Sequence, residues 1–254
     1  MTKTSFNAVR VKEKGGSALK SKVVKRILTV IVVIAAVLLI VMGYFAIRGL
    51  IMWNDARERS PLAETVTELR LREGFVKYEE LPEFYIQAVI STEDRKFETH
   101  GGISVKSIIR ALLYDVKSMS FEQGGSTITQ QLAKNLWFTQ EKRLERKFAE
   151  IYAAFALEKE LTKHEIFELY VNSIYFGSGY YGISDAARGY FDKDVSELTD
   201  YECAMLAGLP NAPSAYSPDA SPELARKRLS LVLDSMKANG VLTNERAQEV
   251  LAMA

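Results

Sequence analysis

The chain is poor in the residues that build disulfide frameworks and metal sites. Its 254 residues include one cysteine and two histidines, and the formal net charge is only +1. A lone cysteine cannot form an internal disulfide, so the fold must rest on packing, and Cys203 is predicted to be a small buried hydrophobic side chain. No zinc-site spacing of His, Cys and carboxylate surrounds His100. Strand-like alternation of apolar and polar residues is nearly absent, which predicts an all-α protein.

One long hydrophobic run stands out. Residues 27–47 read ILTVIVVIAAVLLIVMGYFAI and contain no charged residue. As a helix this run is roughly 31 Å long, enough to cross the hydrocarbon core of a bilayer. A cleaved signal peptide fits poorly, because the run is long and no small-x-small site follows before Arg48. The sequence therefore predicts one N-terminal transmembrane helix, retained as a signal anchor.

Basic residues gather before this run. Residues 1–26 hold eight Lys or Arg against one acid, Glu13, so their net charge is +7 and the rest of the chain nets −6. By the positive-inside rule this segment is predicted to be cytoplasmic and the residues after Arg48 to lie outside. A basic tail could also touch anionic lipid or nucleic acid. With no aromatic residue beyond Phe6, topology is the favoured explanation, and no nucleic-acid partner is predicted.

The chain is predicted to have four parts. They are a basic tail (1–26), the anchor (27–47), a polar juxtamembrane stalk with Pro61 (48–74) and one helical domain (75–254). In the last part apolar residues recur at helical spacing, which predicts helices around 105–116, 144–155, 166–170 and 224–236. Residues 112–121 could face lipid beside the anchor, although a core-facing helix followed by a loop explains the same pattern.

Residues 124–135, GGSTITQQLAKN, read as a glycine turn followed by a helix. Thr127 can cap this helix, and Gln130, three residues on, completes a capping box. Thr127, Gln131 and Lys134 then fall on one face. Free amide N–H groups at the helix N-terminus, together with these side chains, would seat an anion such as phosphate. A capped surface helix with a polar face explains the segment equally well.

Glu93 and Asp94 are candidates for acid–base chemistry. They follow the apolar stretch 85–90, and partial burial would raise a carboxyl pKa towards that of a useful base. An ion pair with Arg95 or Lys96 is the commoner arrangement for such acids.

Glu150 is a third candidate. It lies to one side of the apolar residues that mark the predicted helix, and Arg146 precedes it by four positions. A solvated salt bridge worth about 0.3–0.5 kcal/mol would explain the pair. Placing the cation before the anion supports a helix less well, however, which favours a role beyond helix stability.

Five segments in chain order resemble the motifs of the family 51 glycosyltransferases, the peptidoglycan polymerases. They are Glu93-Asp94-x-x-Phe97-x-x-His100-x-Gly102; residues 124–135; Arg146-Lys147-x-x-Glu150 with Leu157-Glu158; Tyr170-x-Asn172-x-Ile174-Tyr175-Phe176-Gly177; and Glu202 with Leu206-Ala207-Gly208-Leu209-Pro210, then Pro213 and Tyr216-Ser217-Pro218. The resemblance spans about 125 residues. Its departures are small: Cys203 stands where alanine is usual, and Gly101 doubles a glycine.

The resemblance implies an activity and a set of site residues. Such enzymes have a lysozyme-like, two-lobed helical domain and join lipid II units into β-1,4 glycan strands, with inversion and release of undecaprenyl pyrophosphate, for cell-wall biosynthesis. Glu93 would be the general base and Glu150 the second acid, with Asp94, Phe97 and His100 supporting them. The implied substrate-binding residues are Gly125, Ser126, Thr127, Gln131, Lys134, Asn135 and Arg146. Lys134 and Arg146 would lie near the donor's pyrophosphate.

The resemblance also implies partners and a location. No cofactor is implied as required, although a divalent cation such as Mg²⁺ could assist the pyrophosphate, and no metal ligands are predicted. The expected partners are lipid II, the growing glycan strand, membrane lipid and other proteins of cell-wall synthesis. The expected location is the bacterial cell membrane, crossed once, with the catalytic domain outside.

Three other functions compete with this hypothesis. A wall hydrolase or lytic transglycosylase of related fold would also use two carboxylates, but gives no reason for the set Thr127, Lys134 and Arg146. A scaffold that has lost catalysis is disfavoured, because every expected acid and base is present. In a bifunctional penicillin-binding protein a transpeptidase would begin where this sequence ends, at Ala254. The one S-x-x-K match, Ser17 to Lys20, lies in the predicted cytoplasmic tail, so a monofunctional enzyme is predicted.

Overall fold

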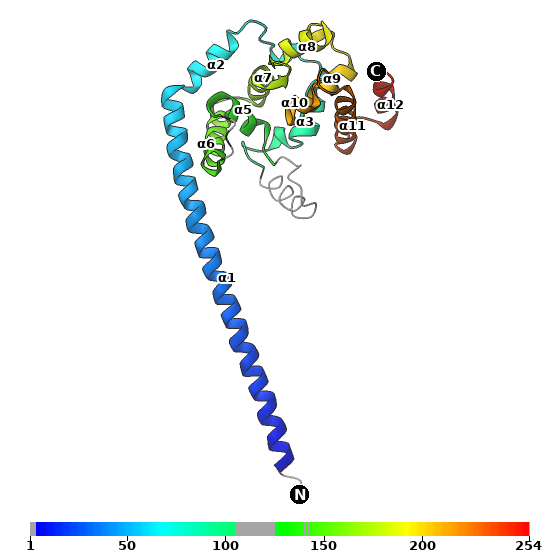
Figure 1. Ribbon diagram of the computed structural model, residues 1–254. Helices are drawn as coiled ribbons and strands as arrows, with labels where there is room; N and C mark the ends of the chain where they lie inside the picture. Colours follow the sequence, from blue (N-terminus) through cyan, green and yellow to red (C-terminus); the bar gives the residue numbers. More distant parts are fainter. Residues whose placement is uncertain (1–3, 105–124, 140, 142, 254) are drawn as a thin grey trace. The chain divides into compact units, whose positions relative to one another are not determined.

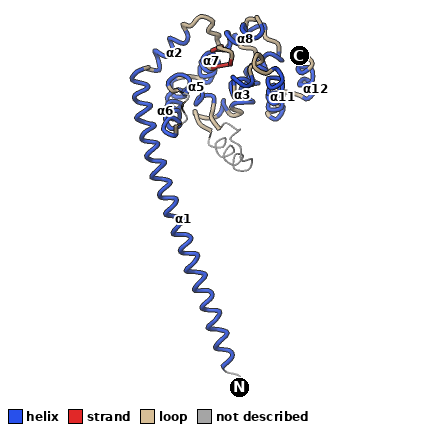
Figure 2. The backbone as a smooth tube through the Cα atoms, in the orientation of Figure 1, coloured by secondary structure: helices blue, strands red, loops and turns tan. Residues whose placement is uncertain are grey.

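A computed structural model of the chain describes residues 4–104, 125–139, 141 and 143–253. It divides into two compact units, residues 1–48 and 49–254. Helices dominate the described residues (Figures 1 and 2), and strand is confined there to one antiparallel hairpin, β1 (Tyr175–Gly177) with β2 (Tyr180–Tyr181). The prediction of a helical protein is thus confirmed, with a small hairpin that the sequence pattern did not reveal. The helix predicted around 105–116, and the lipid-facing alternative for 112–121, lie outside the described residues.

The first unit consists of the long helix α1, which spans Thr4–Arg59 and so continues into the second unit (Figure 1). Its part from Val23 to Arg59 contains an 18-residue window of mean hydropathy 3.1, none of which is buried. Among the described residues this is the helix long and apolar enough to cross a membrane, judged by length and composition. It includes the predicted anchor, residues 27–47.

Residues 48–74, predicted as a polar stalk, are mostly helical and contribute to the core. They include the end of α1 and the helix α2 (Leu62–Arg70), which begins directly after Pro61. The buried side chains from this segment are Trp53, Ala56, Val66 and Leu69. Only one or two residues per turn face inward, and for that reason the composition of the segment remains polar.

The helices of the second unit form two neighbouring groups. In one, α3 (Glu83–Glu93), α9 (Asp200–Gly208) and α11 (Pro222–Ala238) pack on one another, with α12 (Asn244–Leu251) against α9 and α11. In the other, α5 (Ile128–Trp137) packs on α6 (Leu144–Glu160) and α7 (Lys163–Ser173). The remaining elements are α8 (Ile183–Phe191), α10 (Pro213–Tyr216) and 3-10 turns at Tyr78–Glu80, Phe97–Thr99, Val195–Glu197 and Leu209–Asn211. The largest fully buried side chains include Tyr85, Phe97, Phe167, Tyr170 and Phe176.

Three of these helices begin with the same device. Thr127, Thr162 and Thr199 each accept a hydrogen bond from the backbone N–H three residues on, whose own side chain reaches back to the threonine N–H. Each such capping box satisfies two amide groups that the helix itself cannot pair. The box predicted at Thr127 is confirmed.

The apolar pattern that marks α6 does not lie on its buried face. Leu144 and Phe155 are 56% and 45% exposed, and Phe148 and Ile151 are half-buried. The buried residues of the helix are Ala149, Glu150, Ala153, Ala154 and Leu157. Small alanines allow α6 to lie close to α5, so the inward face is the less hydrophobic one by sequence.

Cys203 on α9 is buried, as predicted, and its Sγ lies 4.0 Å from the carbonyl oxygen of Leu198. Burial raises the pKa of its thiol to about 12. The group is therefore a neutral thiol at physiological pH and not a nucleophile.

Candidate active site

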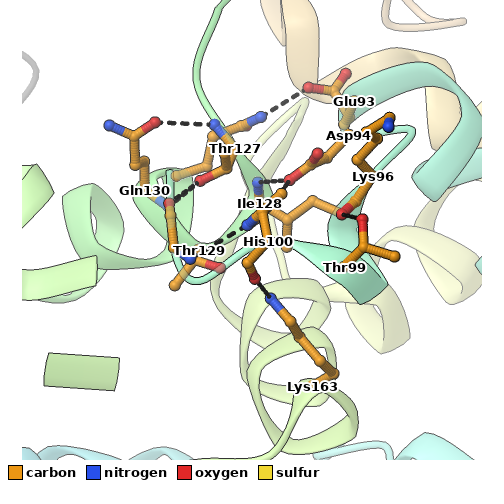
Figure 3. Close-up of polar contacts among 12 residues, drawn as sticks. Glu93, Asp94, Lys96, Thr99, His100, Thr127, Ile128, Thr129, Gln130 and Lys163 are labelled. Carbon is orange, nitrogen blue, oxygen red and sulfur yellow. Dashed lines mark hydrogen bonds and ion pairs between the residues drawn. The ribbon is translucent and has the colours of Figure 1, made fainter. Parts of the chain in front are cut away.

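Glu93 ends α3, because the backbone leaves the helical region at Asp94 (φ −154°, ψ 79°). Its side chain is 10% exposed. Nε2 of Gln131 donates to the carboxylate at 2.8 Å (the dashed line from Glu93 in Figure 3), and a guanidinium nitrogen of Arg228 lies 3.8 Å away. Burial raises the pKa of Glu93, while Gln131, Arg228 and Lys134 oppose that rise. Such a carboxylate accepts a proton more readily than an exposed one.

Asp94, the next residue after Glu93, has a structural role. Its Oδ2 lies 2.6 Å from Nε2 of His100 and accepts the backbone N–H of Ile128 at 3.2 Å (Figure 3). Since Nδ1 of His100 accepts the N–H of Gly102 at 3.1 Å, the partners assign the ring proton to Nε2. Asp94 and His100 thus tie the end of α3 to the start of α5. Phe97 lies between them in sequence and is fully buried.

Part of the N-terminus of α5 is already occupied by the protein, so three of the amide groups that were predicted to be free are paired. The N–H of Thr127 donates to the side chain of Gln130 at 3.1 Å, that of Gln130 to Oγ1 of Thr127 at 3.1 Å, and that of Ile128 to Asp94. The Thr127 hydroxyl itself donates to the carbonyl of Gly102 at 2.6 Å. A carboxylate, Asp94, already lies where the incoming anion was predicted.

This arrangement predicts the effect of removing the Asp94 carboxylate. Asp94→Ala should lose two hydrogen bonds to a buried charged group, each worth about 1.5–3 kcal/mol, and so lower the melting temperature clearly. Asp94→Asn keeps an oxygen acceptor and should fall between. Thermal unfolding followed by circular dichroism measures both; an alanine variant as stable as the wild type would contradict the assignment.

The cations of the site gather around Glu150, which is 2% exposed. Arg146 donates to one oxygen at 2.6 Å and Lys147 to the other at 2.9 Å. Lys147 also donates to Oγ of Ser126 at 2.6 Å. Arg146 and Glu150 are therefore a buried pair and not the solvated surface bridge that the sequence left open. Nε of Arg146 is buried and finds no hydrogen-bond partner among the described residues.

Lys134 connects the two acids electrostatically. It is half-buried on α5, and within the described part of the chain no hydrogen bond or ion pair of its ammonium group is found. Burial lowers its pKa, as do Arg146 and Lys147, whereas Glu150 and Glu93 both raise it. A desolvated ammonium group without a partner is costly. Together with the Arg146 Nε group, it marks this place as suited to an anion.

The remaining predicted site residues lie around this cluster. Gln131 is held by Tyr170, whose hydroxyl lies 3.4 Å from its side-chain oxygen. Gly125, Ser126 and Asn135 are half-buried. The sequence reasoning assigned no role to Lys147, Tyr170 or Arg228. Lys147 and Tyr170 stand within the motifs, but nothing local singles out Arg228, which reaches Glu93 from α11 and donates to the carbonyl of Gly208 at 3.0 Å.

Among the described residues the site offers cations and carboxylates but no set of metal ligands. Within the described residues, no three His, Cys, Asp or Glu side chains are grouped so as to hold a metal ion. Chemically, the arrangement provides a base with a raised pKa on α3 and a positive cluster on α5 and α6. Those two elements suit the attack of a hydroxyl group on a carbon that carries a phosphate-type leaving group.

Comparison with known proteins agrees with the motifs. Residues 60–237 match the sequence model of the Transglycosylase family. Penicillin-binding protein 1A of Aquifex aeolicus is 46% identical over 177 residues, which cover 70% of this chain and 24% of that protein. Penicillin-binding protein 1A of Neisseria flavescens is 42% identical over 180 residues, with 71% and 23% covered. The chain thus spans about a quarter of the length of these relatives. A crystal structure of penicillin-binding protein 1A from Haemophilus influenzae aligns with a TM-score of 0.43 at 24% identity, over 72% of this chain and 18% of that one.

Proposed function

Since the chain belongs to the Transglycosylase family, we propose that it is a peptidoglycan glycosyltransferase. In this proposal it polymerises lipid II into β-1,4-linked glycan strands, with inversion and release of undecaprenyl pyrophosphate. The observation that carries the proposal is the cation cluster at Glu150: Arg146 and Lys147 form ion pairs with this buried carboxylate, and the half-buried Lys134, whose pKa both Glu150 and Glu93 raise, adds a further cation. A hydrolase has no need of such a cation, whereas a pyrophosphate leaving group does.

The attack step is assigned to Glu93. The 4-hydroxyl oxygen of the acceptor sugar attacks the anomeric carbon of the donor, and the hydroxyl proton passes to the Glu93 carboxylate. Gln131 orients the carboxylate through its 2.8 Å hydrogen bond. Because attack comes from the face opposite the leaving group, the configuration at that carbon inverts.

The departure step is assigned to the cation cluster. The bond between the anomeric carbon and the phosphate oxygen breaks, and its electron pair remains on undecaprenyl pyrophosphate. A pyrophosphate leaves without being protonated, so the site needs positive charge more than a general acid. Lys134 and Nε of Arg146 supply that charge. Glu150, the second acidic residue of the site, holds Arg146 and Lys147 in place through ion pairs. In this proposal a divalent cation such as Mg²⁺ can assist the pyrophosphate but is not required, so polymer formation that persists in EDTA is the expected result.

The apolar part of α1 gives the enzyme its expected location. In this proposal the N-terminus is cytoplasmic, α1 crosses the membrane once, and the catalytic unit lies outside. Because lipid II also lies in the bilayer, restricting both reactants to one surface raises their effective concentration.

Deleting residues 1–47 therefore should leave a folded but less efficient enzyme. The loss should be clear for lipid II in vesicles and smaller for substrate dispersed in detergent, because only the first is confined to a surface. Polymerisation rates at matched bulk concentrations measure both. Equal rates of the two forms on vesicles would refute the tethering argument.

The proposed activity is tested by incubating the protein with purified lipid II and separating the products by size. Polymer is expected. Shorter fragments released from pre-made glycan, with no polymer from lipid II, would instead identify a hydrolase.

A further inference from the structure

Gly49, near the end of α1, is buried against α6. A Cβ atom added at Gly49 would lie 2.4 Å from Cβ of Phe148, 2.8 Å from the carbonyl oxygen of Glu145 and 2.9 Å from the backbone nitrogen of Ala149. These three atoms of α6 are backbone or Cβ atoms, so they cannot move out of the way by a side-chain rotation. Even alanine at this position would therefore push the two helices apart.

The same end of α1 also packs against α5. The rings of Trp53 and Trp137 meet edge to face, with centroids 5.0 Å apart at an interplanar angle of 78°. Nε1 of Trp137 donates to the carbonyl oxygen of Ser60 at 2.9 Å. Trp53 is buried, as is Ala56 one turn later. Trp137 is half-buried, and an aromatic pair of this geometry is worth about 0.5–1.5 kcal/mol beyond its buried area.

These contacts fall next to the cation cluster on both helices. The stretch of α6 that Gly49 touches, residues 145–149, contains Arg146 and Lys147 and directly precedes Glu150. Trp137 is the last residue of α5, one turn after Lys134. The end of α1 is thus in contact with the two helices that together carry the positive charge. It also lies before residue 60, where the match to the family begins.

We propose that residues 49–59 are a positioning element of the active site and that Gly49 is a positioning residue. By packing on α5 and α6 together, these turns of α1 fix the spacing between Lys134 on one helix and Arg146 and Glu150 on the other. That spacing determines whether the cations converge on one phosphate-type anion. The identification of the anion as a pyrophosphate ester rests on the proposed function, whereas the claim about helix spacing does not.

The chain contains its own control. Gly43 lies in the same helix, and a Cβ there meets nothing within 4 Å. Replacing glycine by alanine inside a helix gains about 1 kcal/mol in intrinsic propensity at either position. A difference between Gly49→Ala and Gly43→Ala therefore reports the contact with α6 and not the change in helix propensity.

The experiment uses the full chain in detergent micelles and two readouts that need no polymer. The protein has only two tryptophans, and both lie in this contact, so their emission reports its integrity. Calorimetric titration with inorganic pyrophosphate at low salt reports the cation cluster. Gly49→Ala is expected to shift the emission to the red and to weaken pyrophosphate binding about fivefold or more. Gly43→Ala should match the wild type in both.

The outcomes separate the two proposals. Pyrophosphate affinity of Gly49→Ala within twofold of the wild type overturns the inference, even if the emission shifts, because the contact would then be structural only. If Gly49→Ala does not fold, Trp53→Ala replaces it, and an unchanged affinity in that variant also overturns the inference. A wild type that makes no polymer from lipid II, while Gly49→Ala still binds pyrophosphate more weakly than Gly43→Ala, would remove the proposed function and leave the positioning element in place.

Discussion

Glu93→Gln is expected to abolish the formation of glycan polymer without loss of the fold. Glutamine keeps the size of the side chain and can still accept the hydrogen bond from Gln131, but it cannot take up a proton. Since general base catalysis contributes about 10²–10⁴-fold to rate, the rate with purified lipid II should fall by a factor in that range, which leaves no detectable polymer in the time of a wild-type assay. Full activity of this variant would rule out Glu93 as the base.

The pH dependence provides an independent check on Glu93. Burial raises the pKa of its carboxyl group above the usual value, so the folded chain holds this proton more tightly than the unfolded chain. The stability this provides is present below the usual carboxyl pKa and is lost as pH rises through the raised pKa. At neutral pH the ionised group therefore lowers the stability of the fold, and Glu93→Gln should melt at the wild-type temperature or slightly above it. Its advantage should grow as pH rises from below the usual carboxyl pKa through the raised pKa of Glu93, and the acid limb of wild-type kcat/KM should lie above the usual carboxyl pKa.

Lys134→Ala is expected to have the second largest effect, on the binding of pyrophosphate-bearing substrate. A contact between an ammonium group and an anion is worth about 1.5–3 kcal/mol, which corresponds to roughly 10–100-fold in affinity. The fold should not suffer, since among the described residues no hydrogen bond or ion pair of this ammonium group is found. Titration with undecaprenyl pyrophosphate in micelles measures the loss, and unchanged affinity would remove Lys134 from the anion site.

A charge-matched control separates local from long-range effects. Lys159 is exposed near the end of α6, and Lys159→Ala removes the same unit of charge away from the cluster, so its affinity should stay near the wild type. Burial also lowers the pKa of Lys134. Wild-type affinity should therefore fall as pH rises through a value below that of an ordinary lysine, and Lys134→Ala should lack this decline.

Local patterns could be predicted from the sequence, whereas pairings between distant segments could not. The capping box at Thr127 depends on residues three positions apart, and the burial of Cys203 follows from its small, apolar neighbours; both are confirmed. The hydrogen bond from Asp94 to the start of α5 was not foreseen, because Asp94 stands 34 residues before Ile128 in the sequence. Arg228 was missed for the same reason, since only the packing of α11 on α3 brings it to Glu93.

Helix α6 shows a different limit of sequence reasoning. Its hydrophobic residues form a regular pattern, yet alanines and Glu150 face inward. Periodicity identifies a helix but not which face is buried, when the inward face is built from small residues and a paired charge. The closeness of the Arg146–Glu150 pair was visible in the sequence; its burial was not.

The outer side of α6 also has a practical bearing on handling the protein. Leu144 and Phe155 remain exposed there, and exposed apolar side chains on one face promote self-association. Removing the hydrophobic N-terminal stretch is thus not expected to yield a species that behaves well in plain buffer. Preparations of the shortened chain and of the whole chain should be stored and compared in the same detergent. Otherwise aggregation would be mistaken for a loss of catalytic activity.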